Sequence, residues 1–298
     1  MSIALATGLF AALAWGIVDV VAAVAGRRLG VFRTVVIEQI GSLIGLTLFA
    51  LIVPSAMGPT AGAGILAAIP MGLISSVGFI CQFAALRLGP VSVVGPLVGS
   101  YGGFTVVLAI LLRGELLQPL QALGAVLATA GVVLTGVVFH GGSLRGAKLV
   151  GPGVIAAVVS ALAFATTSVL LAGPIHEYGS SAAVAGSRIG NFVLTGVIFG
   201  AASLTGVAFF RPLLVAGPLV RRLVALVMLA GMGDIAGFLA FGVGLDIGPV
   251  WLVGLVSSFG PVLAIVYGLV WLHERLHLTQ WIGMLLIGVS LVLLAVAG

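Results

Sequence analysis

The amino-acid sequence predicts an all-α integral membrane protein, with ten transmembrane helices arranged as two inverted repeats of five helices. The apolar composition, ten long apolar segments and an internal duplication predict this fold. Hydrophobic residues make up 61% of the 298 residues and charged residues only 6%, against about a quarter in soluble domains. A water-facing surface cannot be built from this composition, so we expect the chain to lie in a lipid bilayer.

A transmembrane helix needs about 20 consecutive apolar residues, and segments of this kind follow one another along the whole chain. They are expected at residues 3–25, 32–53, 63–85, 91–112, 119–138, 151–173, 182–204, 223–245, 250–272 and 278–297. Little remains for a soluble domain. Glycines four residues apart favour close packing of such helices, and they occur at Gly41/Gly45, Gly95/Gly99, Gly196/Gly200 and Gly233/Gly237.

The two halves of the chain are related in sequence. The segment from Gly72 to Leu127 matches, without a gap, the segment 159 residues further on, as Glu115 matches Glu274. The earlier helices match at an offset of 149, which aligns Trp15 with Phe164. Repetition at half the chain length indicates a duplication. Because each repeat holds an odd number of helices, the second repeat must enter the membrane from the opposite side.

The repeats are expected at residues 1–138 and 151–298, with residues 139–150 as a polar linker. Ten Lys and Arg residues follow odd-numbered helices, whereas only Arg113 follows an even-numbered one. Cytoplasmic loops are enriched in these residues, so both termini are predicted on the extracytoplasmic side of the cytoplasmic membrane. The net charge of +5 is explained by these loops, and nucleic acid is not an expected partner.

Four short motifs stand in a characteristic order, and two of them occur in both halves. Gly114-Glu115 precedes Gln121-Ala-Leu-Gly124, and His273-Glu274 precedes Gln280-Trp-Ile-Gly283; Ala14-Trp15-Gly16 and Ser257-Ser-Phe-Gly-Pro261 complete the set. Together they resemble, over nearly the whole chain, the EamA-type members of the drug/metabolite transporter superfamily. The resemblance implies a secondary transporter that moves small metabolites, commonly amino acids or drugs outward, through a cavity lined by both halves. The predicted orientation of the termini is opposite to that family's usual one.

Charged side chains within the expected helices are the first candidates for function, because each costs about 2.5–3.5 kcal/mol to insert at the bilayer centre. They are Asp19, Glu38, Arg188 and Asp234. The alternative is that they only pair inside the bundle and hold helices together. The duplication aligns Asp234 with Ser75, Asp19 with Ser168 and Arg188 with Gln39, so we expect an asymmetric site.

The chemistry of these residues suggests two roles. Desolvation favours the protonated form of a carboxyl group, so Asp19, Glu38 and Asp234 are candidates for proton coupling. Arg188 is a candidate for binding a substrate carboxylate in a bidentate pair. The other candidate substrate-binding residues are polar or aromatic, with ordinary helix packing as the alternative: Trp15, Ser100, Tyr101, Phe164, Thr167, Asn191, Ser257 and Ser258, in addition to Asp19 and Asp234.

Two further groups of residues are expected to be structural. Glu115 and Glu274 each stand just before the next helix, where a carboxylate meets unpaired backbone N–H groups and the positive end of the helix dipole. Trp251, Trp271 and Trp281 lie near helix ends and are expected to anchor the protein at the membrane interface.

The segment His273-Glu274-Arg-Leu-His277 matches the zinc-protease pattern H-E-x-x-H, in which two imidazoles on one helix face bind the metal. However, it lies in a short turn, and the duplication aligns it with a segment that keeps the Glu and lacks both His. An intramembrane zinc protease is therefore the alternative from another class, and neither a metal nor a cofactor is expected.

The sequence thus predicts a secondary transporter and not an enzyme. We expect it to export a small metabolite such as an amino acid by alternating access, with protons as a candidate coupling ion. Efflux of a cationic drug or polyamine is the alternative that the acidic residues Asp19, Glu38 and Asp234 also fit. A passive channel is disfavoured because buried charges of both signs obstruct conduction. A monomer and a homodimer both remain open.

Overall fold

The computed structural model describes residues 2–29, 31–88, 97–135, 152–204, 218–260, 262–263 and 278–297. Within these ranges the chain forms ten α-helices, a short 3-10 helix and no strand. The helices are α1 (Ile3–Leu29), α2 (Val31–Ile52), α3 (Ala61–Leu88), α5 (Tyr101–Arg113), α6 (Pro119–Thr135), α7 (Pro152–Tyr178), α8 (Ser180–Leu204), α9 (Pro218–Ile247), α10 (Val250–Ser257) and α12 (Leu278–Ala297), with η1 (Pro54–Met57) after α2. The predicted all-α class is confirmed.

The helices have the length and the outward-facing side chains of a membrane protein. Seven of those in the described ranges are long and apolar enough to cross a bilayer: α1, α2, α3, α7, α8, α9 and α12. Leu51, Leu66 and Leu111 are 71–72% exposed, whereas Ala68 and Ala157 are wholly buried. Large apolar side chains on the outside and small ones inside suit a protein surrounded by lipid.

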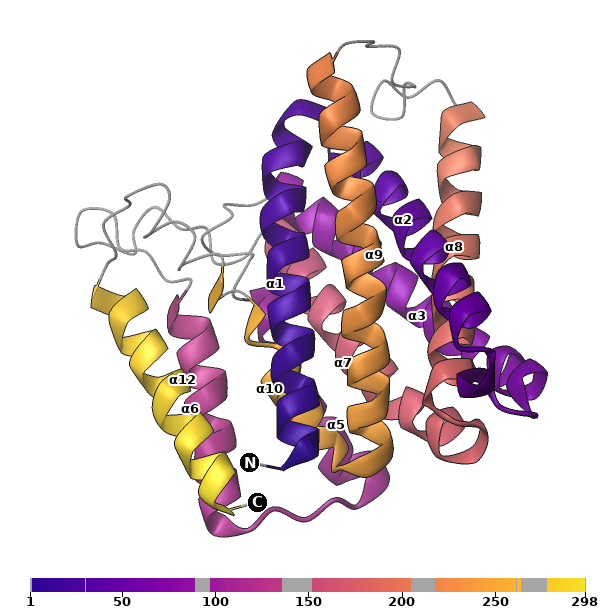
Figure 1. The fold of residues 1–298 in the computed structure, drawn as a ribbon. Coiled ribbons are helices and arrows are strands. Elements are labelled where there is room, and N and C mark those ends of the chain that lie inside the picture. The colour runs from indigo at the N-terminus through magenta and orange to yellow at the C-terminus, as the bar shows by residue number, and fades with distance from the viewer. Residues whose placement is uncertain are drawn as a thin grey trace.

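Successive helices run in opposite directions, and both chain ends lie at the same end of the bundle, here named the terminus face (Figure 1). Helix α1 begins at the terminus face, whereas α7, the first helix of the second repeat, ends there (Figure 1). The second repeat is therefore inverted, as predicted. The expected linker at residues 139–150 lies outside the described residues.

The helix contacts obey the two-fold relation between the repeats. Helix α9 packs along α1 and α2, and its counterpart α3 packs along α7 and α8, the counterparts of α1 and α2. Helix α6 packs on its counterpart α12, and α5 packs on α10, which the 159-residue offset aligns with residues 91–98 just ahead of α5. The pair α6/α12 stands at the edge of the bundle (Figure 1). The duplication in sequence is thus also a duplication of helix packing.

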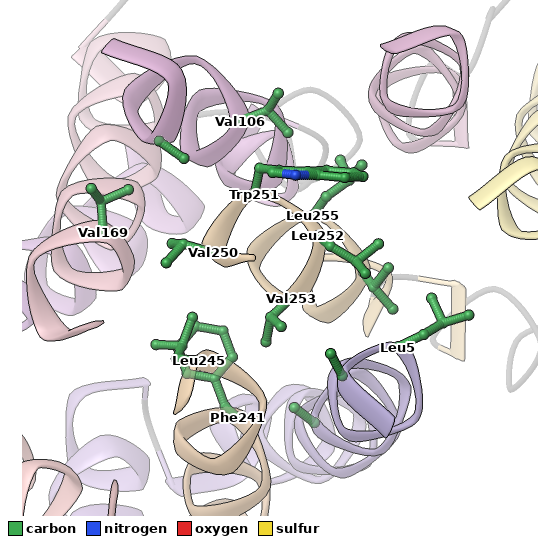
Figure 2. Close-up of a cluster of buried hydrophobic side chains, with 14 of the residues drawn as sticks. Leu5, Val106, Val169, Phe241, Leu245, Val250, Trp251, Leu252, Val253 and Leu255 are labelled. Atoms are coloured by element: carbon green, nitrogen blue, oxygen red, sulfur yellow. The ribbon is translucent and has the colours of Figure 1, made fainter. Parts of the chain in front are cut away.

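Helix α10 lies at the centre of the largest apolar cluster. All eight of its residues are buried, and Figure 2 shows Leu252, Val253 and Leu255 among side chains of neighbouring helices. Trp251 is only 3% exposed and lies beside Val106 of α5 (Figure 2), so the prediction that it anchors the membrane interface is wrong. Trp281 is 50% exposed on α12, and Trp271 lies outside the described residues.

Glu115 caps a helix that belongs to the other repeat. Its Oε1 accepts a hydrogen bond from the backbone N–H of Val250 at 3.0 Å and its Oε2 accepts one from Trp251 at 3.0 Å. It does not serve the next helix in the chain, although the sequence led us to expect this. The carboxylate instead reaches the free N–H groups at the start of α10. Glu274 lies outside the described residues.

Glycines let the backbones of crossing helices touch. A Cβ on Gly231 of α9 would collide with the carbonyl oxygen of Glu38, and a Cβ on Gly72 of α3 would collide with that of Ser187. Gly231 and Gly72 are related by the 159-residue offset, and Ser187 and Glu38 by the 149-residue offset. The α2–α9 and α3–α8 crossings are therefore copies of one contact.

The predicted glycine pairs have mixed outcomes. Gly41 and Gly45 pack on α9, as predicted, whereas a Cβ on Gly196 or Gly200 would meet nothing within 4 Å. Those two residues do not form a helix contact, because a four-residue spacing marks one face of a helix and not which neighbour faces it. Gly237 packs against Trp15, Gly233 has open space, and Gly95 lies outside the described residues.

We predict that Gly231→Ala and Gly72→Ala each lower the melting temperature in detergent, because the added methyl group would force two backbones apart at a cost of about 1–3 kcal/mol. Gly233→Ala is the matched control: its methyl group has space, and Ala is the better helix former, so stability is unchanged or slightly higher. Equal melting temperatures for Gly231→Ala and Gly233→Ala would contradict the close backbone contact.

Candidate functional site

A buried ion pair joins three helices near the middle of the bundle. Arg188 of α8 places Nη2 at 2.7 Å from Oδ2 of Asp234 on α9 and donates a second bond of 3.2 Å to the hydroxyl of Ser42 on α2. Ser42 in turn donates to Oδ2 of Asp234 at 3.1 Å. We name Ser42, Arg188 and Asp234 the charged triad. Each of its members is at most 4% exposed.

The charged triad has acidic and aromatic surroundings. Oε1 of Glu38 lies 4.0 Å from Nη2 of Arg188, and the guanidinium stands 4.4 Å from the ring centre of Phe238 and 5.8 Å from that of Phe79. A cation over an aromatic ring is stabilised by the ring quadrupole. Nη1 of Arg188 is buried without a hydrogen-bond partner in the described part of the chain. This buried donor is free to bind an oxygen atom of a ligand.

Asp19 of α1 differs from the other three charged residues. It interacts electrostatically with Asp234 and Glu38, so it belongs to the same group of charges. Its side chain is nevertheless exposed, whereas those of Glu38, Arg188 and Asp234 are buried. Helix α1 therefore keeps Asp19 near the buried group of charges while leaving it accessible in the bundle.

A second, uncharged triad lies beside the first. Gln39 of α2 donates from Nε2 to Oδ1 of Asn191 on α8 at 2.8 Å, and Asn191 donates from Nδ2 to the hydroxyl of Ser75 on α3 at 3.2 Å. All three side chains are at most 4% exposed. Thr195 adds a weaker contact to Gln39 at 3.5 Å. We name Gln39, Ser75 and Asn191 the neutral triad.

The two triads are counterparts under the repeat. The sequence offsets relate Arg188 to Gln39, Ser42 to Asn191 and Asp234 to Ser75. The hydrogen bonds correspond as well, since Arg188 bonds to Ser42 as Gln39 bonds to Asn191, and Ser42 to Asp234 as Asn191 to Ser75. One geometry is therefore built twice, with charges in only one copy. The asymmetry expected from the sequence therefore consists of two equivalent hydrogen-bonded triads, of which only one is charged.

The aromatic candidates follow the same relation. Trp15 stands 4.8 Å from Phe238 between ring centres and packs on Gly237, and Phe164 stands 5.1 Å from Phe79 and packs on Gly78. Nε1 of Trp15 is buried and has no hydrogen-bond partner among the described residues. Both aromatic pairs thus border Arg188, through Phe238 on one side and Phe79 on the other.

The remaining candidates do not join the triads. The hydroxyl of Tyr101 lies 3.0 Å from that of Ser257, and Tyr101 also contacts the ring of Phe164 at 6.1 Å. Ser100 and Ser258 donate to carbonyl groups three residues earlier in the chain, and Thr167 donates to the carbonyl of Met71.

Three residues of the site were not predicted from the sequence: Ser42, Phe79 and Phe238. The repeat gives a signal for them, because the 149-residue offset aligns Ser42 with the candidate Asn191 and the 159-residue offset aligns Phe79 with Phe238.

A small cavity lies between the triads. Its lining includes Ser42 and Arg188 of the charged triad and Gln39 and Asn191 of the neutral triad, and its volume of about 10 Å³ is close to the least that holds one water molecule. A larger hollow of about 520 Å³ at the terminus face, lined by Ile3, Trp251 and Leu294 among others, contains no charged residue. The smaller cavity is the better candidate for a polar binding site, because hydrogen-bond donors and a charged group line it.

Two inverted repeats of helices around buried charges define the class of protein, since this architecture is typical of secondary transporters. The EamA-like transporter family model matches residues 2–137 and 151–296, and the chain belongs to that family. A solved structure titled "Crystal structure of protein" is similar, with a TM-score of 0.72, 21% identity, and coverage of 99% of this chain and 97% of that chain. At this identity the likeness concerns the fold alone. None of the curated proteins compared with the sequence matches it.

We predict that Asp234→Ala lowers the free energy of unfolding by about 3–5 kcal/mol, because it leaves the Arg188 guanidinium buried and without its counter-ion. Ser75→Ala, at the corresponding position of the neutral triad, removes only a hydrogen bond between uncharged groups, worth about 0.5–1.5 kcal/mol. Thermal unfolding of both variants in one detergent measures the difference. Equal losses would mean that the ion pair is not buried as described.

Proposed function

We propose that the protein exports small metabolites such as amino acids across the cytoplasmic membrane by alternating access. Membership of a transporter family supports transport as such. The observation that supports the substrate class is the buried Nη1 group of Arg188, which has no partner among the described residues and lies in a group of acidic and aromatic side chains. A guanidinium donor of this kind suits a carboxylate.

The balance of charge supports a zwitterionic substrate. Arg188 faces Asp234 and Glu38, and Asp19 interacts with both, so three carboxyl groups accompany one guanidinium. Such an excess of acid is compensated by an ammonium group or by protons. An amino acid brings a carboxylate for Arg188 and an ammonium group for an acidic residue. Trp15 and Phe238 offer apolar surface for its side chain.

Proton coupling is the second part of the proposal. Asp19 is exposed and interacts electrostatically with the buried Asp234 and Glu38, so a proton can pass between an accessible group and the buried ion pair. Protonation of Asp234 would weaken its bond to Arg188, and Arg188 would then be available to a substrate carboxylate. Proton uptake and substrate binding would thereby be linked through one ion pair.

Efflux of a cationic drug or polyamine is the second candidate function, and the excess of carboxyl groups is the observation that favours it. Competition separates the candidates: an amine without a carboxylate should inhibit transport only under this second function. The zinc-protease pattern His273-Glu274-His277 lies outside the described residues. Stoichiometric zinc in the purified protein, lost in His273→Ala, would favour that alternative.

We also propose that both termini are extracytoplasmic. Among the described residues, Arg113 lies at the terminus face, whereas the opposite ends of α1, α2 and α9 carry Arg28, Arg33, Arg221 and Arg222. A reporter that is active only in the cytoplasm should be inactive when fused to the C-terminus. Activity of that fusion would reverse the orientation.

In proteoliposomes, we expect a pH gradient to stimulate transport of labelled amino acids by the unchanged protein and not by Asp234→Asn. Asparagine keeps the shape and a carbonyl acceptor for Arg188 but carries no proton. Asp246→Asn is the matched control, because Asp246 is exposed near the end of the same helix and should behave like the unchanged protein. If Asp234→Asn retains its response to the gradient while folded, Asp234 has no coupling role.

A further inference from the structure

The end of the bundle opposite the terminus face carries arginines from three helices. Arg28 lies in the last turn of α1, Arg33 in the first turn of α2, and Arg221 and Arg222 near the start of α9. These three helix ends lie together at that end of the bundle (Figure 1). Arg28, Arg221 and Arg222 are exposed, and Arg33 is half-buried. We name the four residues the arginine group.

A packed apolar junction holds these helix ends in place. Leu29 of α1 and Val227 of α9 are at most 2% exposed and belong to one apolar cluster, against which Ile37 of α2 and Leu223 of α9 pack. Leu29 and Leu223 each directly follow an arginine of the group. The arginine group is therefore brought together by the packed core of three helices, and not only by its position near loops.

Three members of the arginine group have no counter-ion among the described residues. Arg28, Arg221 and Arg222 form no ion pair and no side-chain hydrogen bond there. By contrast, Arg113 at the terminus face places Nε at 3.7 Å from Oε1 of Glu115. Exposed cations without counter-ions attract anions from their surroundings.

The acidic residues are found elsewhere in the chain. Of the seven in the sequence, three lie within the bundle and three at the terminus face: Asp19, Glu38 and Asp234 in the first set, and Glu115, Glu177 and Asp246 in the second. Glu274 lies outside the described residues and is followed directly by Arg275, so this pair adds no net negative charge. The end that carries the arginine group is therefore the one that suits an anionic partner.

The duplication indicates that the fold does not require this charge. Continued to the helix ends, the two offsets relate the apolar junction to one at the terminus face, where a Cβ on Gly64 of α3 would lie 2.7 Å from that of Tyr178 on α7. The equivalent junction has no arginine, and Glu177 occupies the position of Arg28. The same packing of three helices therefore forms without the arginine group, which indicates that the arginines serve another role.

An outward-facing apolar stripe continues from the arginine group along α9. Arg222, Leu226 and Leu229 follow one another at steps of four and three residues, which places them on one face of the helix. Leu226 is 45% exposed and Leu229 is 63% exposed. A cation at the end of an apolar surface matches the phosphate and the acyl chains of a phospholipid, whereas a soluble anion would use the cation alone.

We propose that the arginine group binds the headgroup of an anionic phospholipid, with the acyl chains along Leu226 and Leu229. Basic pockets between transmembrane helices bind such headgroups. The enrichment of Lys and Arg in cytoplasmic loops depends only on their number, whereas a packed junction of this kind forms a site with a preferred ligand. The proposed orientation of the termini places the site in the cytoplasmic leaflet, whose surface is negatively charged. The inference does not rest on the proposed substrate.

Titration of the full chain in detergent with phosphatidylglycerol, followed by native mass spectrometry, tests this proposal. We expect phosphatidylglycerol to bind more tightly than phosphatidylcholine with the same acyl chains. Joint replacement by Arg28→Gln, Arg221→Gln and Arg222→Gln should weaken phosphatidylglycerol binding about 100-fold, because each arginine near the membrane surface strengthens the attraction about fivefold. Lysine at the same three positions should keep most of the affinity, since the charge is retained.

Two single variants that remove the same charge provide the matched comparison. Arg222→Gln should weaken phosphatidylglycerol binding about fivefold, and Arg113→Gln at the terminus face should leave it unchanged. Equal losses in the two variants would overturn the proposal, because net charge and not a site would then explain the binding. Displacement of the lipid by inorganic phosphate at equal concentration, or equally tight binding of phosphatidylcholine, would also overturn it.

Folding and transport are controlled separately. Melting temperatures without added lipid report whether each variant is folded, and the single variants keep the test decisive where the triple variant does not fold. The readout needs no transported substrate, so failure of the amino-acid assignment would appear as absent transport with the lipid binding intact.

Discussion

The burial of a permanently charged guanidinium governs the centre of this protein. Lipid and apolar side chains cannot solvate Arg188, so its neighbours must supply counter-charge and hydrogen bonds. Asp234 and Ser42 do so from two different helices, and Phe238 adds the face of its ring. Those helices come close enough only because Gly41 and Gly231 let their backbones touch. The helix crossing and the ion pair therefore depend on each other.

The duplication explains why the same hydrogen-bonded arrangement occurs in both repeats, and later substitutions explain why only one copy is charged. The backbone at the charged triad is repeated at the neutral triad, down to corresponding hydrogen bonds. Only one copy carries charge, with Arg188 and Asp234 standing where the other has Gln39 and Ser75. No polar atom of the neutral triad is buried without a partner in the described part of the chain, so this triad costs little to bury. The charged triad leaves Nη1 of Arg188 buried without a partner among the described residues, which is the more useful feature for recognising a polar ligand.

Contacts between the two repeats determine the partners and the burial of residues whose surroundings cannot be read from the neighbouring sequence. Glu115 precedes α6 in the chain, but its carboxylate accepts hydrogen bonds from the start of α10. Trp251 lies at the beginning of a helix, where membrane interfaces favour Trp, yet it is enclosed between helices of both repeats. In both cases the neighbour in space belongs to the other half of the chain. A helix-end pattern carries no information about that partner.

The sequence by itself determined the membrane environment, the ten helices, their inversion and the four charged residues within them. These properties follow from apolar length, from the odd number of helices in each repeat and from the offsets of 149 and 159, all of which are read along one dimension. Only the tertiary structure decided that Arg188 pairs with Asp234, that Asp19 is accessible, and that no described residue packs against Gly196. The physical reason is that an apolar helix in lipid shows little difference between its faces, so the sequence does not specify which face meets which neighbour.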